Sequence, residues 1–376
     1  MTFVIPPELN PSPRLLMGPG PTMVHPRVLR AMSTPLLGYL DPEFVVIMDE
    51  TQALLRHVFQ TENTWTLPVS GTGMAGMESL LANLLEPGER LLVCAAGYFG
   101  SRLEEVARRH GIEVTKLEKP WGEVYAPEEV EAALRANPAN PAKVVAIVHA
   151  ETSTGALQPL EGLGEIAHRH GALLLVDCVT SLGGVPLRLD DWGIDAAYSG
   201  TQKCLGCPPG MAPVSVSERA REAIRARRTP PSAWYFDLAQ LARYWGPERV
   251  YHHTVSCSLV YALREGLRLV AEEGLEARWA RHAANAQQFC DGLAELDLAP
   301  FVPAPNRLPT LITVRVPDGL DEARVRTRLR QEYHIEIGAG LGPLKGQVWR
   351  VGLMGVSSQR ENVTLLLGAL REILKD

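Results

Sequence analysis

Short, almost continuously apolar runs alternate with amphipathic stretches through the first two thirds of the chain. Runs of this kind are typical of strands that are buried on both faces of a sheet. The alternation predicts an α/β fold in which helices cover a parallel or mostly parallel sheet. The predicted strands are WTLPVS (65–70), RLLVCAA (90–96), KVVAIVHA (143–150), ALLLVDC (172–178), IDAAYSG (194–200) and MAPVSVS (211–217). The helices predicted around them span about 42–59, 76–86, 101–111 and 160–171.

The pattern changes near residue 275. A long charged helix is predicted over 276–296, and about a hundred residues of α+β character form a second domain of ordinary size. At the other end, residues 1–26 hold prolines at seven positions, which keep this segment extended. We therefore expect an arm over 1–13, a large domain over 14–274 and a small domain over 275–376. The small domain is predicted to contain strands at 308–317 and 347–353 and helices at 321–333 and 360–374.

The composition argues against several classes of partner. Charged residues make up 21% of the 376 residues, the net charge is −6, and the basic residues are scattered rather than clustered. Such a distribution argues against nucleic acid or an anionic membrane as a partner. The N-terminus lacks the pattern of a signal peptide, and no apolar run is long enough to span a bilayer, so we expect a cytoplasmic protein.

The residues that could bind a metal do not form a convincing site. Only Cys204 and Cys207 form a C-x-x-C pair, without the second pair or the spaced histidines that a structural zinc ion needs. Two prolines follow this pair, whereas a redox-active pair would open a helix. His252 and His253 are adjacent in a predicted extended segment, so we expect their side chains to point to opposite sides. We predict reduced, buried thiols and no metal site.

The sequence SGTGMAGMES places Gly71, Gly73 and Gly76 between a predicted strand and a predicted helix, in the order of a dinucleotide-binding turn. Dinucleotide binding also requires an acidic residue at the end of the next strand, where the chain has VCAAG. The turn suits a smaller anion, because glycines let the backbone approach it and the helix N-terminus offers N–H groups. Ser70 and Thr72 add hydroxyl donors. We predict a site for one phosphate monoester, with a purely structural tight turn as the alternative.

Two residues follow neighbouring predicted strands. Asp177 closes ALLLVDC, and Lys203 follows 26 positions later (203 − 177 = 26) at the end of IDAAYSGTQ. Beside a phosphate site they suit pyridoxal phosphate, because a lysine amine can join its aldehyde and an aspartate can keep its pyridine nitrogen protonated. Opposite charges about 4 Å apart attract by about 4 kcal/mol at an effective dielectric constant near 20, which is enough to protonate that nitrogen. A helix cap or a salt bridge is the alternative role of Asp177 alone.

Seven ordered motifs extend from about residue 14 to the end of the chain: LLMGPGPTMVHPRVL, SGTGMAGMES, HAETSTGALQPL, LLLVDCVTSLGGVPL, YSGTQKCLGCPPG, WGPERVYHHT and WRVGLMG. They resemble the class V pyridoxal phosphate-dependent aminotransferases, and within that family mainly the alanine–glyoxylate (serine–pyruvate) group. The resemblance implies the fold-type I α/β architecture, with a mostly parallel seven-stranded sheet in the large domain and a small C-terminal α+β domain. It also implies pyridoxal 5'-phosphate as the cofactor and a homodimer.

The resemblance further implies roles for individual residues. Lys203 matches the lysine that binds the cofactor aldehyde, and Asp177 matches the partner of the pyridine nitrogen. Tyr251 and Thr254 match residues that reach the phosphate from the other subunit, and Arg350 matches the group that binds the substrate α-carboxylate. The remaining matches are Thr72, Gly73, Met74 and Gln202 at the phosphate, Thr152 near the ring hydroxyl, Phe99 over the ring, and Gly18 in the substrate pocket.

Three departures from the family pattern bear on the site. Phe99 stands where relatives usually carry a tryptophan, which reduces the stacking area. Met74 stands where one relative has histidine, so only its backbone N–H can help to bind phosphate. Tyr39 and Leu40 stand where many relatives carry His-Arg, which removes a possible anion site for the donor side chain. We therefore expect a small neutral donor, alanine or serine, and glyoxylate or pyruvate as the acceptor, in a two-stage exchange that yields glycine or alanine.

Some alternatives stay open at this point. The glycine-rich stretch GAGLGPLKG (338–346) precedes a predicted strand rather than a helix, so we expect a turn that positions Arg350. A surface ion pair is the alternative role of Arg350. A lyase or desulfurase on the same fold would need a mobile cysteine, for which Cys207 is the only candidate near the lysine. A non-catalytic homologue would keep the fold and bind no cofactor.

Overall fold

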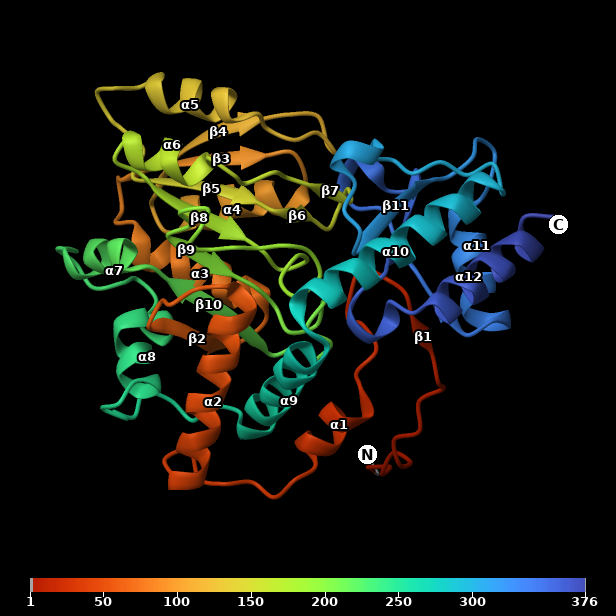
Figure 1. Ribbon diagram of the computed structural model, residues 1–376, viewed down its shortest axis with the longest axis horizontal. Helices are drawn as coiled ribbons and strands as arrows, with labels where there is room; N and C mark the ends of the chain where they lie inside the picture. The colour runs from red at the N-terminus through yellow and green to blue at the C-terminus, as the bar shows by residue number, and fades with distance from the viewer. Residues whose placement is uncertain (1–2, 376) are drawn as a thin grey trace.

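One seven-stranded sheet forms the centre of the larger part of the molecule in the computed structural model, which describes residues 3–375 (Figure 1). Its strands are β2 (Trp65–Ser70), β3 (Arg90–Ala95), β4 (Glu113–Glu118), β5 (Val144–Val148), β8 (Leu173–Asp177), β9 (Ala196–Tyr198) and β10 (Met211–Val216). They lie in the spatial order β2-β10-β9-β8-β5-β3-β4, and every neighbouring pair is parallel except the two that include β10. The predicted mostly parallel, seven-stranded sheet is confirmed.

The apolar pattern identified six of these strands and missed β4. All residues of β3, β5, β8, β9 and β10 are buried, because these central strands are covered on both faces. In contrast, β4 lies at one edge of the sheet, and its residues EVTKLE are exposed or only partly buried, whereas the strand at the other edge, β2, is mostly buried. A polar edge strand has no continuous apolar run to reveal it, and its charges discourage pairing with another sheet.

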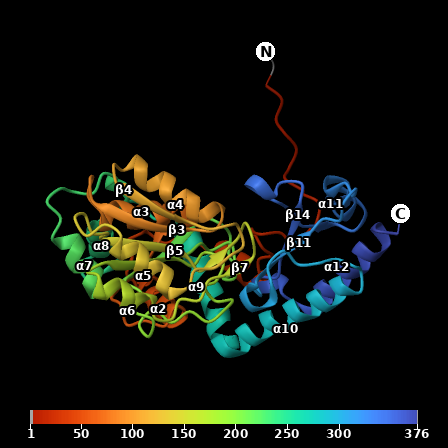
Figure 2. The same cartoon turned by 90° about the horizontal axis from the view of Figure 1, so that it is seen from above.

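Helices cover both faces of the sheet (Figure 2). They are α1 (Pro26–Met32), α2 (Pro42–Phe59), α3 (Gly73–Leu84), α4 (Tyr98–Arg109), α5 (Pro127–Arg135), α6 (Leu163–Arg169), α7 (Glu218–Arg225), α8 (Leu238–Trp245) and α9 (Cys257–Glu273). The predicted helix at 42–59 is confirmed as α2. Capping residues explain why this helix begins and ends where it does. Asp41 accepts the Glu43 N–H at 2.8 Å, and Gln60 ends the helix in the left-handed conformation.

A second, smaller core lies in the C-terminal part of the chain. The predicted α+β elements of this region are confirmed, and Phe289, Ile312 and Trp349 are among its buried side chains. Its sheet has the strand order β11-β14-β13. The elements are α10 (Leu275–Ala294), β11 (Leu311–Arg315), α11 (Glu322–Glu332), β13 (Gly338–Ala339), β14 (Val348–Gly352) and α12 (Arg360–Ile373). The domain limits at 14 and 275 stay predictions.

The segment that precedes α1 joins the two cores. β1 (Leu15–Leu16) pairs in parallel with β12 (Ile335–Glu336), and Met17 is buried in the smaller core, although the sequence pattern assigned it to the large domain. Residues 3–13 are exposed, have no helix or strand, and project from the body of the molecule (Figure 2). Residues 1 and 2 of the predicted arm lie outside the described residues.

The remaining elements are short. They are β6 (Ala150–Glu151), β7 (Ala156–Leu157) and the single 3₁₀ turns η1 (Trp234–Phe236), η2 (Ala304–Asn306), η3 (Gly342–Leu344) and η4 (Gly355–Ser357). Within residues 3–375, no helix combines the length and the apolar character that crossing a lipid bilayer requires.

Candidate active site

The carboxyl ends of β8 and β9 bring Asp177 and Lys203 to the same edge of the large sheet. Asp177 is the last residue of β8, and Lys203 lies in the loop that follows β9. Both side chains are buried, and they are close enough for each charge to shift the pKa of the other. Ligands of open α/β sheets bind at this edge, beyond the carboxyl ends of the strands.

Two hydrogen bonds hold the Asp177 carboxylate. Its Oδ2 accepts the Tyr198 hydroxyl at 2.6 Å, and its Oδ1 accepts the Val179 N–H at 2.9 Å. Burial raises the pKa of Asp177 to about 7, although both hydrogen bonds favour the ionised form. A cation placed beside this carboxylate, such as a protonated ring nitrogen, stabilises its ionised form further.

The N-terminal segment covers the Lys203 amine. Lys203 Nζ donates a hydrogen bond to the Pro19 carbonyl, and Thr22 Oγ1 donates to the Lys203 carbonyl at 3.2 Å. Gly20 has a φ of +106°, and a Cβ there would lie 2.8 Å from Lys203 Nζ, so both conformation and space require glycine. Burial, and next the charge of Arg350, lower the pKa of Lys203 to about 8. A fraction of this amine is therefore uncharged near neutral pH and available as a nucleophile or base.

The turn between β2 and α3 offers hydrogen-bond donors to a ligand. Thr72 is the N-cap residue of α3, and within the described chain its side chain makes no capping hydrogen bond. The first N–H groups of the helix, those of Gly73 and Met74, have no intrahelical acceptor and point toward the helix N-terminus. A Cβ on Gly73 would lie 2.9 Å from Val179 Cγ2, so a larger residue would block the turn.

Gln202 completes this anion site. A Cβ built on Gly200 would lie 2.8 Å from Gln202 Oε1 and 3.4 Å from the Gly73 nitrogen, so these two atoms are close together. Gln202 Oε1 is buried and has no hydrogen-bond partner among the residues that the structure describes. A rotated amide presents its N–H groups at the same place. An unpartnered amide beside an uncapped helix N-terminus fits the phosphate group of pyridoxal phosphate.

Arg350 lies on β14 and reaches from the smaller core to the sheet edge. Its Nε donates to the Ala339 carbonyl at 2.7 Å, and a terminal nitrogen donates to the Thr152 carbonyl at 3.3 Å. Gly338 of β13 is the register partner of Arg350, so the stretch 338–346, expected to be a turn, begins with a short strand that pairs with β14 and turns only after it, at η3. Burial lowers the pKa of Arg350 to about 10, which leaves it a cation near neutral pH. Its remaining N–H groups can bind a carboxylate.

Two further predicted residues, Gly18 and Thr152, lie near Arg350. Gly18 is buried, and a Cβ on it would lie 3.7 Å from the Gly338 nitrogen. Thr152 is buried beside the sheet edge, and its hydroxyl contacts that of Thr180. The structure thus brings the predicted substrate residues and the ring-hydroxyl residue to one place.

Glu151 is a part of this edge that the sequence pattern did not reveal. Its buried carboxylate accepts the Ser153 hydroxyl at 2.6 Å and the N–H groups of Phe99 and Gly100 at 3.2 and 3.3 Å. These bonds anchor the start of α4, where Phe99 was predicted to cover the cofactor ring. The sequence did contain a pattern that could have identified Glu151 as a residue of this edge, because Glu151, like Asp177, is an acidic residue that comes soon after a fully apolar run.

Tyr251 and Thr254 lie elsewhere, on the surface. Both are exposed, their hydroxyl groups are 3.2 Å apart, and the Tyr251 ring packs on Tyr39 with a centroid distance of 5.0 Å. Within residues 3–375, no hydrogen bond joins either side chain to Lys203 or Asp177. The described hydrogen bonds of a single chain therefore do not link these two residues to Lys203 or Asp177.

The expected orientation of His252 and His253 was wrong. Their Nδ1 atoms are 2.9 Å apart, because the segment is irregular and the alternation of a strand does not apply. His253 Nε2 also lies 2.7 Å from Ser70 Oγ, and the His252 ring stacks on Trp234 at a centroid distance of 4.4 Å. The pair thus ties the segment of Tyr251 to the end of β2.

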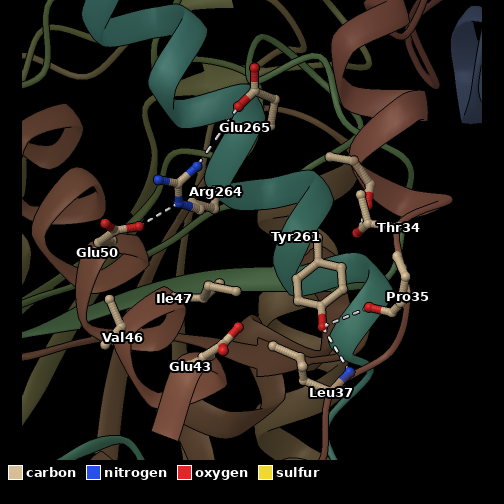
Figure 3. A pocket seen from close by; sticks show the side chains of 11 residues that line it. Thr34, Pro35, Leu37, Glu43, Val46, Ile47, Glu50, Tyr261, Arg264 and Glu265 are labelled. Atoms are coloured by element: carbon tan, nitrogen blue, oxygen red, sulfur yellow. Dashed lines mark hydrogen bonds and ion pairs between the residues drawn. The ribbon is translucent and has the colours of Figure 1, made fainter.

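A separate cavity of about 650 Å³ lies between the α1–α2 loop, α2 and α9 (Figure 3). Its polar groups are largely satisfied within the chain: the Tyr261 hydroxyl bonds the backbone of Pro35 and Leu37, and Arg264 pairs with Glu50 at 2.6 Å. None of its lining residues belongs to the predicted site. This cavity is therefore separate from the predicted site at the sheet edge.

Comparison with known proteins agrees with this geometry. The family model described as "Aminotransferase class-V" matches residues 15–366. The (S)-ureidoglycine–glyoxylate transaminase of Bacillus subtilis (strain 168) is 42% identical over 98% of this chain and 92% of its own length. The alanine–glyoxylate aminotransferase of Rattus norvegicus is 44% identical over 99% of this chain and 92% of its own.

A solved structure shows the same likeness in three dimensions. The crystal structure of an alanine–glyoxylate aminotransferase from Nostoc sp. superposes with a TM-score of 0.96 at 52% identity, covering 99% of this chain and 98% of that one. Fold, sequence and the residues at the sheet edge therefore agree. The chain belongs to the class V aminotransferases, enzymes of fold type I that depend on pyridoxal phosphate.

Proposed function

We propose that this enzyme transfers the amino group of a small neutral amino acid, alanine or serine, to glyoxylate or pyruvate, and so forms glycine or alanine. The observation that carries the proposal is the meeting of Lys203, Asp177 and Arg350 at one sheet edge beside an uncapped helix N-terminus. Relatives at 42–52% identity are named for transamination with glyoxylate, which supports this acceptor.

Each charged residue has a chemical role in this proposal. When bound, pyridoxal phosphate supplies an aldehyde for the amino group and a ring that withdraws electrons from the donor Cα. Lys203 holds the cofactor, then takes the Cα proton of the donor and returns it on the cofactor side, for which its lowered pKa is suited. Asp177 balances the charge of the protonated ring nitrogen. Arg350 binds the α-carboxylate and orients the Cα proton toward Lys203.

The other residues position the cofactor. Thr72, Gly73, Met74 and Gln202 bind its phosphate through the helix N-terminus, a hydroxyl and an amide. Phe99 would cover the ring, and Thr152 would lie beside the ring hydroxyl group. Together with the phosphate-binding residues and Asp177, they would hold the cofactor in one orientation relative to Lys203.

A small neutral donor agrees with the residues around Tyr39. The Tyr39 ring packs on Tyr251, Leu40 is 45% exposed, and neither carries a positive charge that could pair with a side-chain carboxylate. A second carboxylate on the donor would have to leave water without a cationic partner, which is unfavourable. Alanine and serine avoid this cost.

We also propose a homodimer in which Tyr251 and Thr254 bind the phosphate held by the other subunit. Two features support it. These two residues are exposed, and their hydroxyl groups contact each other rather than Lys203 or Asp177. Next to them, Trp234, Tyr235 and Val250 form an apolar patch, with exposures of 60%, 41% and 40%. Exposed aromatic groups of this kind mark protein interfaces.

The proposed reaction has a direct test. Protein mixed with alanine and glyoxylate should release pyruvate and glycine, and a panel of donors should rank alanine and serine above aspartate and glutamate. Borohydride reduction followed by peptide mapping should find the pyridoxyl group on Lys203. A preparation that stays colourless after pyridoxal phosphate is added would instead indicate a non-catalytic homologue.

A desulfurase-like reaction is disfavoured by the environment of Cys207. This thiol is buried, and its Sγ lies 3.4 Å from the Ala262 carbonyl, inside the core rather than on a mobile loop. Burial raises the pKa of Cys207 to about 12, so it is not a thiolate near neutral pH. Transamination needs no such cysteine.

A further inference from the structure

Tyr198 places a buried hydroxyl group directly on the Asp177 carboxylate. The side chain is fully buried, and the hydroxyl donates to Asp177 Oδ2 at 2.6 Å. The two residues are register partners on the parallel strands β9 and β8. Because the register of these central strands is fixed, the contact is a permanent part of the sheet.

The phosphate-binding turn makes room for this tyrosine. A Cβ on Gly76 would lie 2.9 Å from Tyr198 Cβ and 3.3 Å from Ala212 Cβ. The third glycine of the turn therefore lets α3 lie against Tyr198 and confine it. As a consequence, the tyrosine that contacts Asp177 and the helix that offers N–H groups to phosphate are packed together.

The Tyr198 hydrogen bond is the strongest effect that opposes the burial of Asp177. Burial and the nearby charge of Glu151 raise the pKa of Asp177, whereas Tyr198, then the Val179 N–H, then Lys203 lower it. A proton shared between a carboxylate and a pyridine nitrogen stays mainly on the group with the higher proton affinity. A hydroxyl that donates to the carboxylate lowers the proton affinity of that carboxylate.

We infer that Tyr198 is a positioning residue that holds Asp177 as a carboxylate and so keeps the shared proton on the ring nitrogen of the cofactor. The inference rests on the proposed function, because it needs the bound cofactor. It adds that Tyr198 acts on the ring only through Asp177. In this way a residue that contacts neither substrate nor cofactor controls how strongly the ring withdraws electrons. A protonated ring accepts electrons better than a neutral one.

The test uses pyridoxal phosphate labelled with ¹⁵N at the ring nitrogen, bound to the wild-type protein and to the variants Tyr198→Phe and Tyr125→Phe. The Tyr125 hydroxyl donates to the Leu117 carbonyl at 2.8 Å and not to Asp177. Tyr125→Phe is therefore a matched control, because it also removes one hydrogen bond of a tyrosine hydroxyl. NMR then reports the protonation of the ring nitrogen between pH 6 and pH 9. We expect a protonated ring in the wild type and in Tyr125→Phe. In Tyr198→Phe we expect a shift toward the neutral signal that corresponds to about a tenfold change in the proton ratio.

A second substitution keeps the inference testable if Tyr198→Phe does not fold. Placing 3-fluorotyrosine at position 198 keeps the ring and the hydroxyl but makes the hydroxyl a stronger donor, so the ring nitrogen should keep its proton to a higher pH than in the wild type. Each titration is carried to the pH at which the wild-type ring loses its proton. An unchanged pH dependence of the ¹⁵N signal in a folded Tyr198→Phe or fluorotyrosine protein overturns the inference, and so does an equal change in Tyr125→Phe. If the wild-type protein binds no labelled cofactor at all, the proposed function itself fails.

Discussion

The sheet edge around Lys203 and the surface segment around Tyr251 form two unequal parts of one proposed site. At the edge, Asp177, Lys203 and Arg350 are buried, and each is held by hydrogen bonds within the chain. On the surface, Tyr251 and Thr254 are exposed and contact mainly each other and Tyr39. One chain thus brings the predicted residues Asp177, Lys203 and Arg350 together, whereas Tyr251 and Thr254 stay available to a second copy, as proposed.

The largest effect is expected from Lys203→Ala, which removes the central group of the edge. Turnover of alanine and glyoxylate should fall by about 10⁴-fold or more, because the same amine binds the cofactor and moves the proton. The melting temperature should stay near that of the wild type, since the substitution also removes a buried charge. Undiminished turnover would exclude Lys203 from the reaction.

Asp177→Asn tests the other half of the edge. An amide cannot balance a protonated ring nitrogen, so we expect turnover to fall by about a thousandfold, the equivalent of about 4 kcal/mol. Asp190→Asn, a substitution at an aspartate that bonds Thr61 and Glu62 instead, is the control and should keep full activity. Equal activity of the two variants would mean that Asp177 has only a structural role.

Asp177→Asn should lower the turnover of the loaded enzyme, but it should raise the stability of the cofactor-free protein at neutral pH. The folded-state pKa of Asp177, about 7, lies above its ordinary value of 3.8, so the folded protein binds this proton more tightly than the unfolded chain does. Wild-type stability should therefore fall, by about 4 kcal/mol from this group, as the pH rises from 4 to 7, and then level off. Asp177→Asn should lack this loss. Denaturant unfolding at a series of pH values measures the free energy of unfolding of both proteins. If this free energy changes with pH equally in the wild type and in Asp177→Asn, the buried, partly protonated state of Asp177 is contradicted.

Arg350→Lys should affect binding more than chemistry. Lysine keeps the charge but loses the planar pair of donors and the bond to Ala339, so we expect the KM for alanine to rise about 10- to 100-fold with a smaller change in kcat. The matched control is Arg315→Lys, since that side chain lies on β11 over the Phe301 ring. A KM equal to that of the control would remove Arg350 from the substrate site.

The smallest effect is expected from substitutions in the surface segment around Tyr251, and they test most directly whether this segment serves the other subunit. The double variant Tyr251→Phe with Thr254→Ala should bind pyridoxal phosphate about tenfold more weakly. Mixed with Lys203→Ala subunits at a low cofactor concentration, it should regain activity, because each hybrid dimer contains one site with all of its residues intact. No gain after confirmed subunit exchange would place Tyr251 and Thr254 at the site of their own chain or at none.

The fold was largely predictable because its central strands are buried on both faces. Continuous apolar runs revealed β3, β5 and β8 and placed Asp177 at the end of one of them. The same rule could not find β4, whose sequence EVTKLE is polar and at most partly buried. Local patterns report burial well and position within the sheet poorly.

The contacts around the site were less predictable for a different reason. The bond between Tyr198 and Asp177 depends on the register of two strands, and the bonds of Glu151 depend on the approach of α4. Neither relation is visible in the spacing of residues along one strand. The contact between His252 and His253 likewise depends on an irregular backbone that the sequence pattern took for extended.

The ribbon at residues 15–22 has a consequence for the order in which this protein can mature. It is synthesised before its partners, because it hydrogen-bonds Lys203, lies along β12, and accepts the Gly352 N–H at the Met17 carbonyl. The strands of the large sheet are all synthesised by residue 216, so this sheet can form while the ribbon still waits for its later partners. The contacts of this segment with β12 and Gly352 can therefore form only after all strands of the large sheet have been synthesised.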